Sequence, residues 1–263
     1  MLKDNIEHVN TAILGAGLAG LSAAYHCRGI IYEKENEIGG TCRSLKNKGF
    51  TFDFGIHVLH TRNSYVLRLL LQNKKLNLWR KKRSAWIHSY GALTKYPFQA
   101  NTFGLPENII RECLTGFMGK DRESKKSYDN YEDWIYATFG KGIARNFYLP
   151  YSEKFWTVKA SELTTDWLDI RVPRPRLEQV ITGALSIQKE EFGPNAVFQY
   201  PRYGGIQAIA ETLLKKNIKV ILSKEAKRIE LDKRIVHFSD GSAVSYNNLI
   251  STISLPGHSP FLY

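Results

Sequence analysis

The pattern of apolar and polar residues predicts a strand, a turn and a helix near the start of the chain. Residues 11–14 form a short apolar run, which is typical of a buried parallel strand. A helix is predicted over residues 18–27, and a second strand over residues 29–35. This order of elements indicates the beginning of an α/β sheet.

The middle of the chain has a helical period. Apolar positions predict helices over residues 64–76 and 105–119 and through much of 127–158, with a hairpin over residues 84–99. We expect most aromatic residues of the third helical stretch to lie in the core and a minority to stack on a base or sugar. These aromatic residues are Trp134, Tyr136, Phe139, Phe147, Tyr148, Tyr151, Phe155 and Trp156.

The last part of the chain returns to strands. Residues 196–200 predict a strand, residues 204–216 an amphipathic helix, and residues 219–254 a β-meander whose last strand rejoins the first sheet. The predicted fold class is therefore α/β. A Rossmann-like nucleotide-binding domain of parallel sheet and β-meander, formed by residues 1–75 and 196–263, contains an inserted helix-rich α+β substrate region, residues 76–195.

Composition limits the class of protein. The chain has 263 residues, of which 43% are hydrophobic, so a disordered chain is excluded. The sequence has neither a run of 18 apolar residues, which would predict a membrane-spanning helix, nor a secretory signal in its polar first residues. The three cysteines match neither a disulfide framework nor a zinc site, and His57 and His60 have no further metal ligands at a suitable spacing. We therefore expect a cytoplasmic protein without stable membrane insertion or a metal.

The net charge of +12 leaves two interpretations open. It indicates either a solvated basic surface or an anionic ligand or partner. The basic clusters are short and lack interleaved aromatic residues, so nucleic-acid binding is not expected.

A G-x-G-x-x-G motif follows the first predicted strand. Gly15 permits the tight turn, Gly17 leaves room for a pyrophosphate, and Gly20 lets the helix pack closely on the strand. The helix that follows offers free N–H groups to phosphates. Glu33, at the end of the second strand, can accept hydrogen bonds from both ribose hydroxyls and disfavours NADP. This combination predicts a dinucleotide-binding site, although glycines kept only for packing would be the simpler alternative.

A second glycine pair, Gly39 and Gly40, follows Glu33. It can approach the same pyrophosphate from the other side, and Arg43 and Ser44 can donate to phosphate oxygens. An ordinary Gly-Gly turn remains the alternative. Asp53 is expected to be a structural acid. Ala226, at the start of a meander strand, can hydrogen-bond adenine through its backbone.

Several motifs together resemble UDP-galactopyranose mutase of the eukaryotic-type branch, within the superfamily of FAD-dependent amine oxidase-like and protoporphyrinogen oxidase-like proteins. The resemblance covers nearly the whole chain, and the last three motifs are the most specific. The motifs are "GAGLAG", "IGGTCRS", "FDFGIHVLH", "YPFQANTFGLP", "YEDWIYATFGKGIARNFYLPYSEKFWTV" and "GPNAVFQYPRYGG".

This resemblance implies a cofactor, FAD, which works in its reduced form. In the family, flavin N5 attacks the anomeric carbon of the sugar, UDP leaves, and the sugar reopens and recloses with the other ring size. UDP-galactopyranose and UDP-galactofuranose are thereby interconverted without net redox change, which is an isomerase reaction used in cell-surface polysaccharide biosynthesis. The expected partners are a UDP-sugar substrate and, in a homo-oligomer, further copies of the chain.

The resemblance also assigns site residues by position. His57 resembles a histidine beside the flavin, and Arg171 an arginine near the flavin and sugar, so these two are the catalytic candidates. The substrate-binding candidates are Tyr96 and Gln99 at uridine, Trp156 and Asn195 at the sugar pocket, and Ser152, which stands where the family has asparagine. We also expect Gly204 and Gly205 to leave room for the flavin or the sugar.

Family members continue beyond the position of residue 263, so the resemblance implies that this chain is the N-terminal part of such an enzyme. Two alternatives stay open from the sequence. One is an amine oxidase-like or protoporphyrinogen oxidase-like FAD oxidoreductase that acts on another substrate. The other is a truncated nucleotide-binding protein without catalytic activity.

Overall fold

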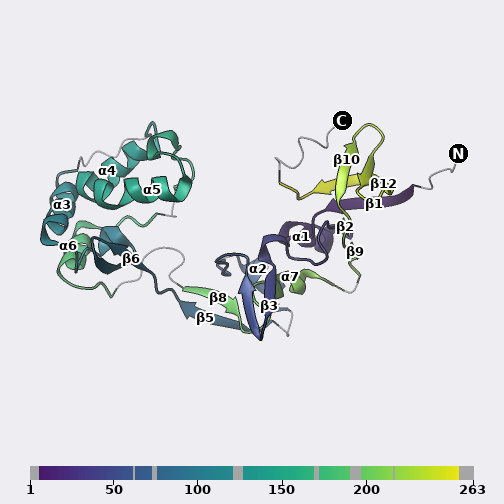
Figure 1. Ribbon diagram of the computed structural model, residues 1–263, viewed down its shortest axis with the longest axis horizontal. Coiled ribbons are helices and arrows are strands. Elements are labelled where there is room, and N and C mark those ends of the chain that lie inside the picture. Colours follow the sequence, from purple (N-terminus) through teal and green to yellow (C-terminus); the bar gives the residue numbers. More distant parts are fainter. Residues whose placement is uncertain are drawn as a thin grey trace. The chain divides into compact units, whose positions relative to one another are not determined.

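The structure, a computed structural model, describes residues 6–61, 63–72, 76–120, 127–168, 172–189, 197–215 and 217–254. The chain forms two compact units, which we describe separately (Figure 1). The first unit contains residues 1–81 and 198–263, and the second contains residues 82–197. The α/β fold class predicted from the sequence is confirmed.

The first unit is built around a six-stranded sheet. Its central strand pairs in parallel with strands on both sides, and an antiparallel meander forms one edge, as the pattern predicted. In spatial order the strands are β10 (Ala226–Glu230), β11 (Ile235–Phe238), β12 (Ala243–Ser251), β1 (Glu7–Leu14), β2 (Ile30–Tyr32) and β9 (Val220–Ile221).

Alternate residues of β1 and β2 face two different cores. Ile13 and Ile31 pack with apolar residues of the helices α1 (Leu18–Cys27), α2 (Ser64–Leu71) and α7 (Gln207–Leu213). Leu14 and Tyr32 instead pack with residues of the meander. Because side chains alternate across a strand, the buried parallel strands are apolar at successive positions.

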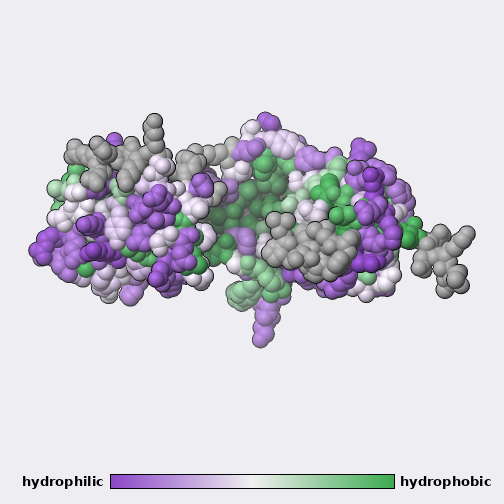
Figure 2. Space-filling view, turned by 90° about the horizontal axis from the view of Figure 1, so that it is seen from above, coloured by the Kyte–Doolittle hydropathy of each residue, from purple (hydrophilic) through white to green (hydrophobic). Residues whose placement is uncertain are grey.

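Two small sheets complete the first unit: a hairpin of β3 (Ser44–Asn47) and β4 (Phe50–Asp53), and a pair of β5 (Leu78–Lys82) and β8 (Val197–Pro201). A short 3₁₀ helix, η1 (Gly40–Cys42), precedes β3. The hairpin and the residues after it expose several apolar side chains, and Figure 2 shows hydrophobic residues at the surface in this part of the view. These side chains are Leu45, Phe50, Phe52, Phe54 and Ile56.

The second unit is mainly helical (teal in Figure 1). Its aromatic core includes Phe98, Trp134, Phe139 and Tyr148. Its elements are the hairpin of β6 (Trp86–Ser89) and β7 (Ala92–Lys95), η2 (Phe98–Ala100), α3 (Glu107–Met118), α4 (Tyr131–Ile143), the π-helical η3 (Ala144–Tyr148), α5 (Leu149–Trp156), η4 (Ala160–Glu162) and α6 (Leu177–Leu185).

Glycines set the close crossing of α3 and α4. A Cβ atom on Gly140 would overlap the carbonyl oxygen of Gly116, and one on Gly142 would overlap that of Glu112. Gly140 also has a φ of +75° and interrupts the regular helix. Only glycine combines this backbone conformation with such a close backbone contact.

Some predicted elements differ from the observed ones. The helix expected from Gly204 begins at Gln207, because Gly204 and Gly205 adopt φ values of +85° and +67°. Four of the listed aromatic residues, Trp134, Phe139, Phe147 and Tyr148, lie in the core as expected, whereas Tyr151, Phe155 and Trp156 are exposed. These three exposed side chains line a pocket of the second unit.

Candidate functional site

A cavity of ≈ 840 Å³ lies in the first unit, at the carboxyl ends of β1 and β2. In parallel α/β sheets this edge is the usual ligand-binding position. Its walls come from both glycine motifs, the end of β2, the start of β10 and the residues after β12. The lining includes the predicted residues Gly15, Gly17, Glu33, Gly39, Gly40, Arg43 and Ala226, and it adds Phe54, Lys224 and Thr252.

Two glycines of the first motif, Gly15 and Gly20, stand where a side chain does not fit. Gly15 has a φ of +96°, and a Cβ there would lie 2.7 Å from Oγ1 of Thr252. A Cβ on Gly20 would overlap the Gly15 carbonyl oxygen, so Gly20 allows α1 to pack against the turn. Gly17, the N-cap of α1, has no neighbouring atom within 3.9 Å of a built Cβ and instead keeps the cavity open.

The second glycine motif packs directly on the first. Gly39 donates its N–H to the Ala16 carbonyl oxygen at 2.9 Å and forms a β-bridge with Gly17. A Cβ on Gly40 would lie 3.1 Å from the Gly17 Cα. The two loops therefore meet through bare backbone, and Gly17, Gly39 and Gly40 line the cavity without side chains.

Six charged residues line this cavity, and Glu33 and Arg43 are the two that the sequence predicted at this site. Glu33 is only 7% exposed, and its oxygens accept hydrogen bonds from the N–H groups of Ala16 (2.5 Å) and Glu35 (3.0 Å). These bonds orient the carboxylate, which retains lone pairs for a ligand hydroxyl. Arg43 donates to the Gly40 carbonyl oxygen at 3.1 Å and forms a 3.0 Å ion pair with Glu35.

The structure gives Ser44 a role different from the predicted phosphate contact. Ser44 is buried and does not line the cavity; its hydroxyl donates to Asp53 at 2.6 Å, and its N–H donates to Gln207 at 2.9 Å. The role expected for Gly205 also differs from the observed one, because a Cβ at this position would overlap the Ser44 hydroxyl. Its missing side chain makes room for the Ser44–Asp53 pair rather than for a flavin or sugar.

Two polar atoms near β8 are buried without a partner among the described residues. They are Nδ1 of His57 and Oε1 of Gln199. The segment carrying His57 joins β8 through paired backbone hydrogen bonds of 2.9 Å between Leu59 and Gln199. His57 does not line the ≈ 840 Å³ cavity. Gln199 had no signal in the sequence, because only strand pairing brings it beside the histidine segment.

The second unit contains a smaller pocket of ≈ 160 Å³. Four of the predicted substrate-binding residues, Tyr96, Gln99, Ser152 and Trp156, lie together in its wall. Sequence reasoning missed the remaining members, which come from distant segments and were expected in the core or not singled out. They are Tyr131, Phe147, Tyr148, Tyr151, Phe155, Trp167, Val172 and Pro173.

Some polar groups of this pocket have few hydrogen-bond partners among the described residues. Gln99 is 1% exposed; its amide donates to the Pro173 carbonyl oxygen at 2.8 Å, whereas its Oε1 has no partner among the described residues. Burial raises the pKa of Tyr131 to about 12, although a hydrogen bond with Ser152 opposes the shift. Burial likewise raises the pKa of Tyr96 and Tyr148. These tyrosines stay neutral and can offer hydroxyl groups to a ligand.

Arg171 and Asn195 lie outside the described residues. Within the described ranges, no group of three or more His, Cys, Asp or Glu side chains could hold a metal ion. No helix in the same ranges is both long and apolar enough to cross a membrane.

The chain is similar to known proteins in sequence and in fold. Residues 13–72 match the NAD(P)-binding Rossmann-like domain family. A crystal structure of reduced UDP-galactopyranose mutase superposes on 97% of this chain with a TM-score of 0.88 and 30% sequence identity. The predicted likeness to UDP-galactopyranose mutase is confirmed. This chain spans 57% of the length of that mutase.

Other relatives share the fold or a part of it. Putrescine oxidase matches 97% of the chain with a TM-score of 0.61 at 17% identity, which shows the fold alone. The 4,4'-diapophytoene desaturase of Staphylococcus aureus (strain Newman) is 45% identical over 49 residues, which are 17% of this chain and 10% of the desaturase. The mutase, the oxidase and the desaturase are flavin enzymes.

These comparisons and the Rossmann-like domain indicate FAD as the cofactor, as predicted. The residues present fit it. The two glycine loops form a cradle that a side chain at Gly17 or Gly40 would narrow, and Glu33 stands at the end of β2 where a ribose is recognised. The N-terminus of α1, which begins at Leu18, supplies free N–H groups for the pyrophosphate.

Proposed function

We propose that this chain carries the FAD-binding and substrate-binding parts of a UDP-galactopyranose mutase, an FAD-dependent isomerase that interconverts UDP-galactopyranose and UDP-galactofuranose. The observation that carries the proposal is the gathering of Tyr96, Gln99, Ser152 and Trp156 in one pocket. Tyr96 and Gln99 come from one motif and Ser152 and Trp156 from another, and residues of the two pairs are 53 to 60 positions apart in the sequence. The mutase superposition over 97% of the chain supports the same assignment.

In this proposal the first unit holds FAD through the two glycine loops and Glu33. Bound reduced flavin would supply the nucleophile for the sugar. His57 and Arg171 remain the proposed catalytic residues. Nδ1 of His57 is buried and has no partner among the described residues, which supports a role for this histidine, because such a nitrogen is suited to contact a ligand.

The pocket in the second unit, residues 82–197, binds the uridine part of the substrate. Its ≈ 160 Å³ is smaller than the roughly 300–1,000 Å³ of sites for drug-sized ligands, so it fits one part of a nucleotide sugar. Exposed faces of Trp156 and Tyr151 can stack on a base, and the free Oε1 of Gln99 can accept the base N–H. Asn195 remains a proposed contact to the sugar.

The proposal includes the cellular location of the enzyme, its pathway and its oligomeric state. We place its reaction in the cytoplasm, in the supply of furanose sugars for cell-surface polysaccharide. Association into homo-oligomers remains a prediction.

The test measures UDP binding by the purified protein with FAD, before and after dithionite reduction. We expect UDP to shift the flavin absorbance, and Trp156→Ala to weaken UDP binding by about 5- to 150-fold through loss of roughly 1–3 kcal/mol of base stacking. Trp86→Ala removes a tryptophan of similar exposure outside the pocket and should leave UDP affinity unchanged. FAD binding without any UDP affinity in either redox state would refute the proposal. Turnover of UDP-galactofuranose only after reduction would extend it to catalysis.

A further inference from the structure

The second glycine loop, residues 37–44, forms part of the wall of the FAD cavity but has little regular structure of its own. Its only helical segment is the three-residue η1. Gly39, Gly40, Cys42 and Arg43 of this loop line the cavity. Their positions therefore depend on contacts with other parts of the first unit.

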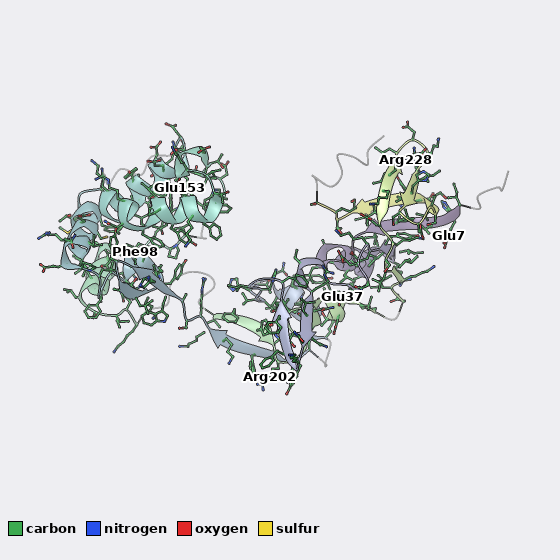
Figure 3. The ribbon with its side chains drawn as sticks, in the orientation of Figure 1. Glu7, Glu37, Phe98, Glu153, Arg202 and Arg228 are labelled. Carbon is green, nitrogen blue, oxygen red and sulfur yellow. The ribbon has the colours of Figure 1, made fainter. Side chains whose placement is uncertain are left out.

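Gln207, the first residue of α7, makes four of these contacts. Its Oε1 accepts the Ser44 N–H at 2.9 Å, and its own N–H donates to the Ser44 hydroxyl at 3.2 Å. The amide group Nε2 donates to the Ile38 carbonyl oxygen at 3.3 Å and to the Glu37 carboxylate at 3.4 Å. Figure 3 shows Glu37 next to α7. One side chain thus bridges both ends of the loop.

Asp53 fixes the same end of the loop from the opposite direction. Its Oδ1 accepts from the Ser44 hydroxyl at 2.6 Å and from the Ile206 N–H at 3.1 Å, and its Oδ2 accepts from the Tyr200 hydroxyl at 2.5 Å. The carboxylate therefore links β4, β8 and the start of α7. The positive φ of Gly205 and its lack of a Cβ allow Ser44 and Asp53 to approach the chain at this point.

We propose that Gln207 and Asp53 are positioning residues, which hold the second glycine loop in the conformation that forms the FAD cavity. Neither residue lines the cavity itself, so each acts through the loop. The inference rests on FAD binding, which the proposed function requires, and it does not depend on the identity of the sugar or on turnover.

The test compares Gln207→Leu with the wild-type protein. Leucine keeps the size of the side chain but removes its hydrogen bonds to Ser44, Ile38 and Glu37. Glu211→Leu, one turn further along α7 at an exposed position, is the matched control. Hydrogen exchange is measured without ligand, and FAD affinity is measured by flavin fluorescence.

We expect Gln207→Leu to speed amide exchange in residues 37–44 at least tenfold, with β1 and the second unit unchanged, and to weaken FAD binding about tenfold. Glu211→Leu should change neither quantity. Equal acceleration throughout the first unit would mean that Gln207 only stabilises the fold, and would overturn the inference. Wild-type exchange in residues 37–44 would overturn it as well.

A swapped pair tests the same contact in a variant that keeps polar groups. Gln207→Glu brings a second carboxylate to Glu37 and should accelerate exchange of the loop, whereas adding Glu37→Gln restores a donor and an acceptor and should reverse part of the effect. Absence of any rescue would contradict a specific contact between these side chains. If the wild-type protein binds FAD but no UDP, the mutase proposal fails while these measurements still decide the role of Gln207.

Discussion

The two candidate sites of this protein differ in whether backbone or side chains form their walls. The FAD cavity of the first unit is formed largely by backbone, at glycines where two loops touch without side chains. The pocket of the second unit is formed by side chains, mostly aromatic rings that helices and short segments bring together. A backbone site is sensitive to added atoms, whereas a side-chain pocket is sensitive to removed atoms and to the packing of its helices.

The largest expected effect concerns the close crossing of α3 and α4 in the second unit. Gly140→Ala should destabilise the second unit by roughly 3–5 kcal/mol, because its Cβ would overlap Gly116 and its φ of +75° is strained for alanine. Urea unfolding followed by tryptophan fluorescence measures this, since Trp134, Trp156 and Trp167 lie in that unit. Gly104→Ala is the control, because Gly104 has a φ of +90° with nothing within 4 Å. Equal losses in both variants would show that the helix crossing contributes nothing.

The second prediction separates two glycines of the backbone site. Gly20→Ala should cost about 3 kcal/mol of stability and abolish FAD binding, because its Cβ would overlap the Gly15 carbonyl oxygen. Gly17→Ala meets no atom closer than 3.9 Å, so it should change stability by less than about 1 kcal/mol while weakening FAD binding at least tenfold. Thermal unfolding and flavin fluorescence report the two quantities. Normal FAD binding by Gly17→Ala would place the pyrophosphate elsewhere.

The third prediction uses cysteines as reporters of the two regions. Cys42 lines the FAD cavity, and burial raises its thiol pKa; burial raises the pKa of Cys113, in the second unit, to about 12. We expect iodoacetamide at pH 8 to modify exposed Cys27 first, Cys42 slowly and Cys113 hardly at all. Added FAD should slow the modification of Cys42 about tenfold, as measured by peptide mass spectrometry. Equal protection of Cys27 would indicate a general stabilisation instead of a local contact.

The smallest expected effect is a dependence of the stability of the first unit on pH. Burial alone would raise the pKa of Asp53, but hydrogen bonds from Ser44, Tyr200 and Ile206, together with His57, hold it below its usual value. In the unfolded chain the carboxyl has its ordinary pKa of about 4, so its contribution is full above that pH and is lost as the pH falls through the lowered folded pKa.

Tyr200→Phe removes one of these hydrogen bonds and should reduce the acid-sensitive stability by about 1 kcal/mol. Unfolding by urea at pH 7 and at pH 3 measures the difference. An identical loss at both pH values would show that the contribution of the hydroxyl does not depend on ionisation of the Asp53 carboxyl.

Much of the first unit could be predicted because its signals are local. Gly15, Gly17, Gly20 and Glu33 stand at fixed spacing around a strand and a helix, and the structure places all of them at or beneath the cavity. The meander was predictable from alternating strands and the Asp240-Gly241 turn. The partners of Ser44, Asp53 and Gln207, could not be predicted in this way, since these contacts span as many as 163 residues.

The pocket of the second unit could be predicted from the sequence only in part. Residue type predicted that its aromatic side chains would be buried, but not which of them would surround a pocket. Tyr151, Phe155 and Trp156 are exposed because α5 presents them at the pocket beside Tyr131 and Trp167. The four predicted positions that line this pocket together came from family resemblance instead of from periodicity.

Local sequence patterns were enough to predict the α/β class, the nucleotide loop and the acid after the second strand. Each depends on backbone conformation and on residues close together along the chain. Three further features are evident only in the folded chain: Gly205 accommodates Ser44 and Asp53, Gln207 bridges the second glycine loop, and Gln199 lies on the strand paired with the histidine segment. These features depend on distances between segments far apart in sequence, which are set by packing.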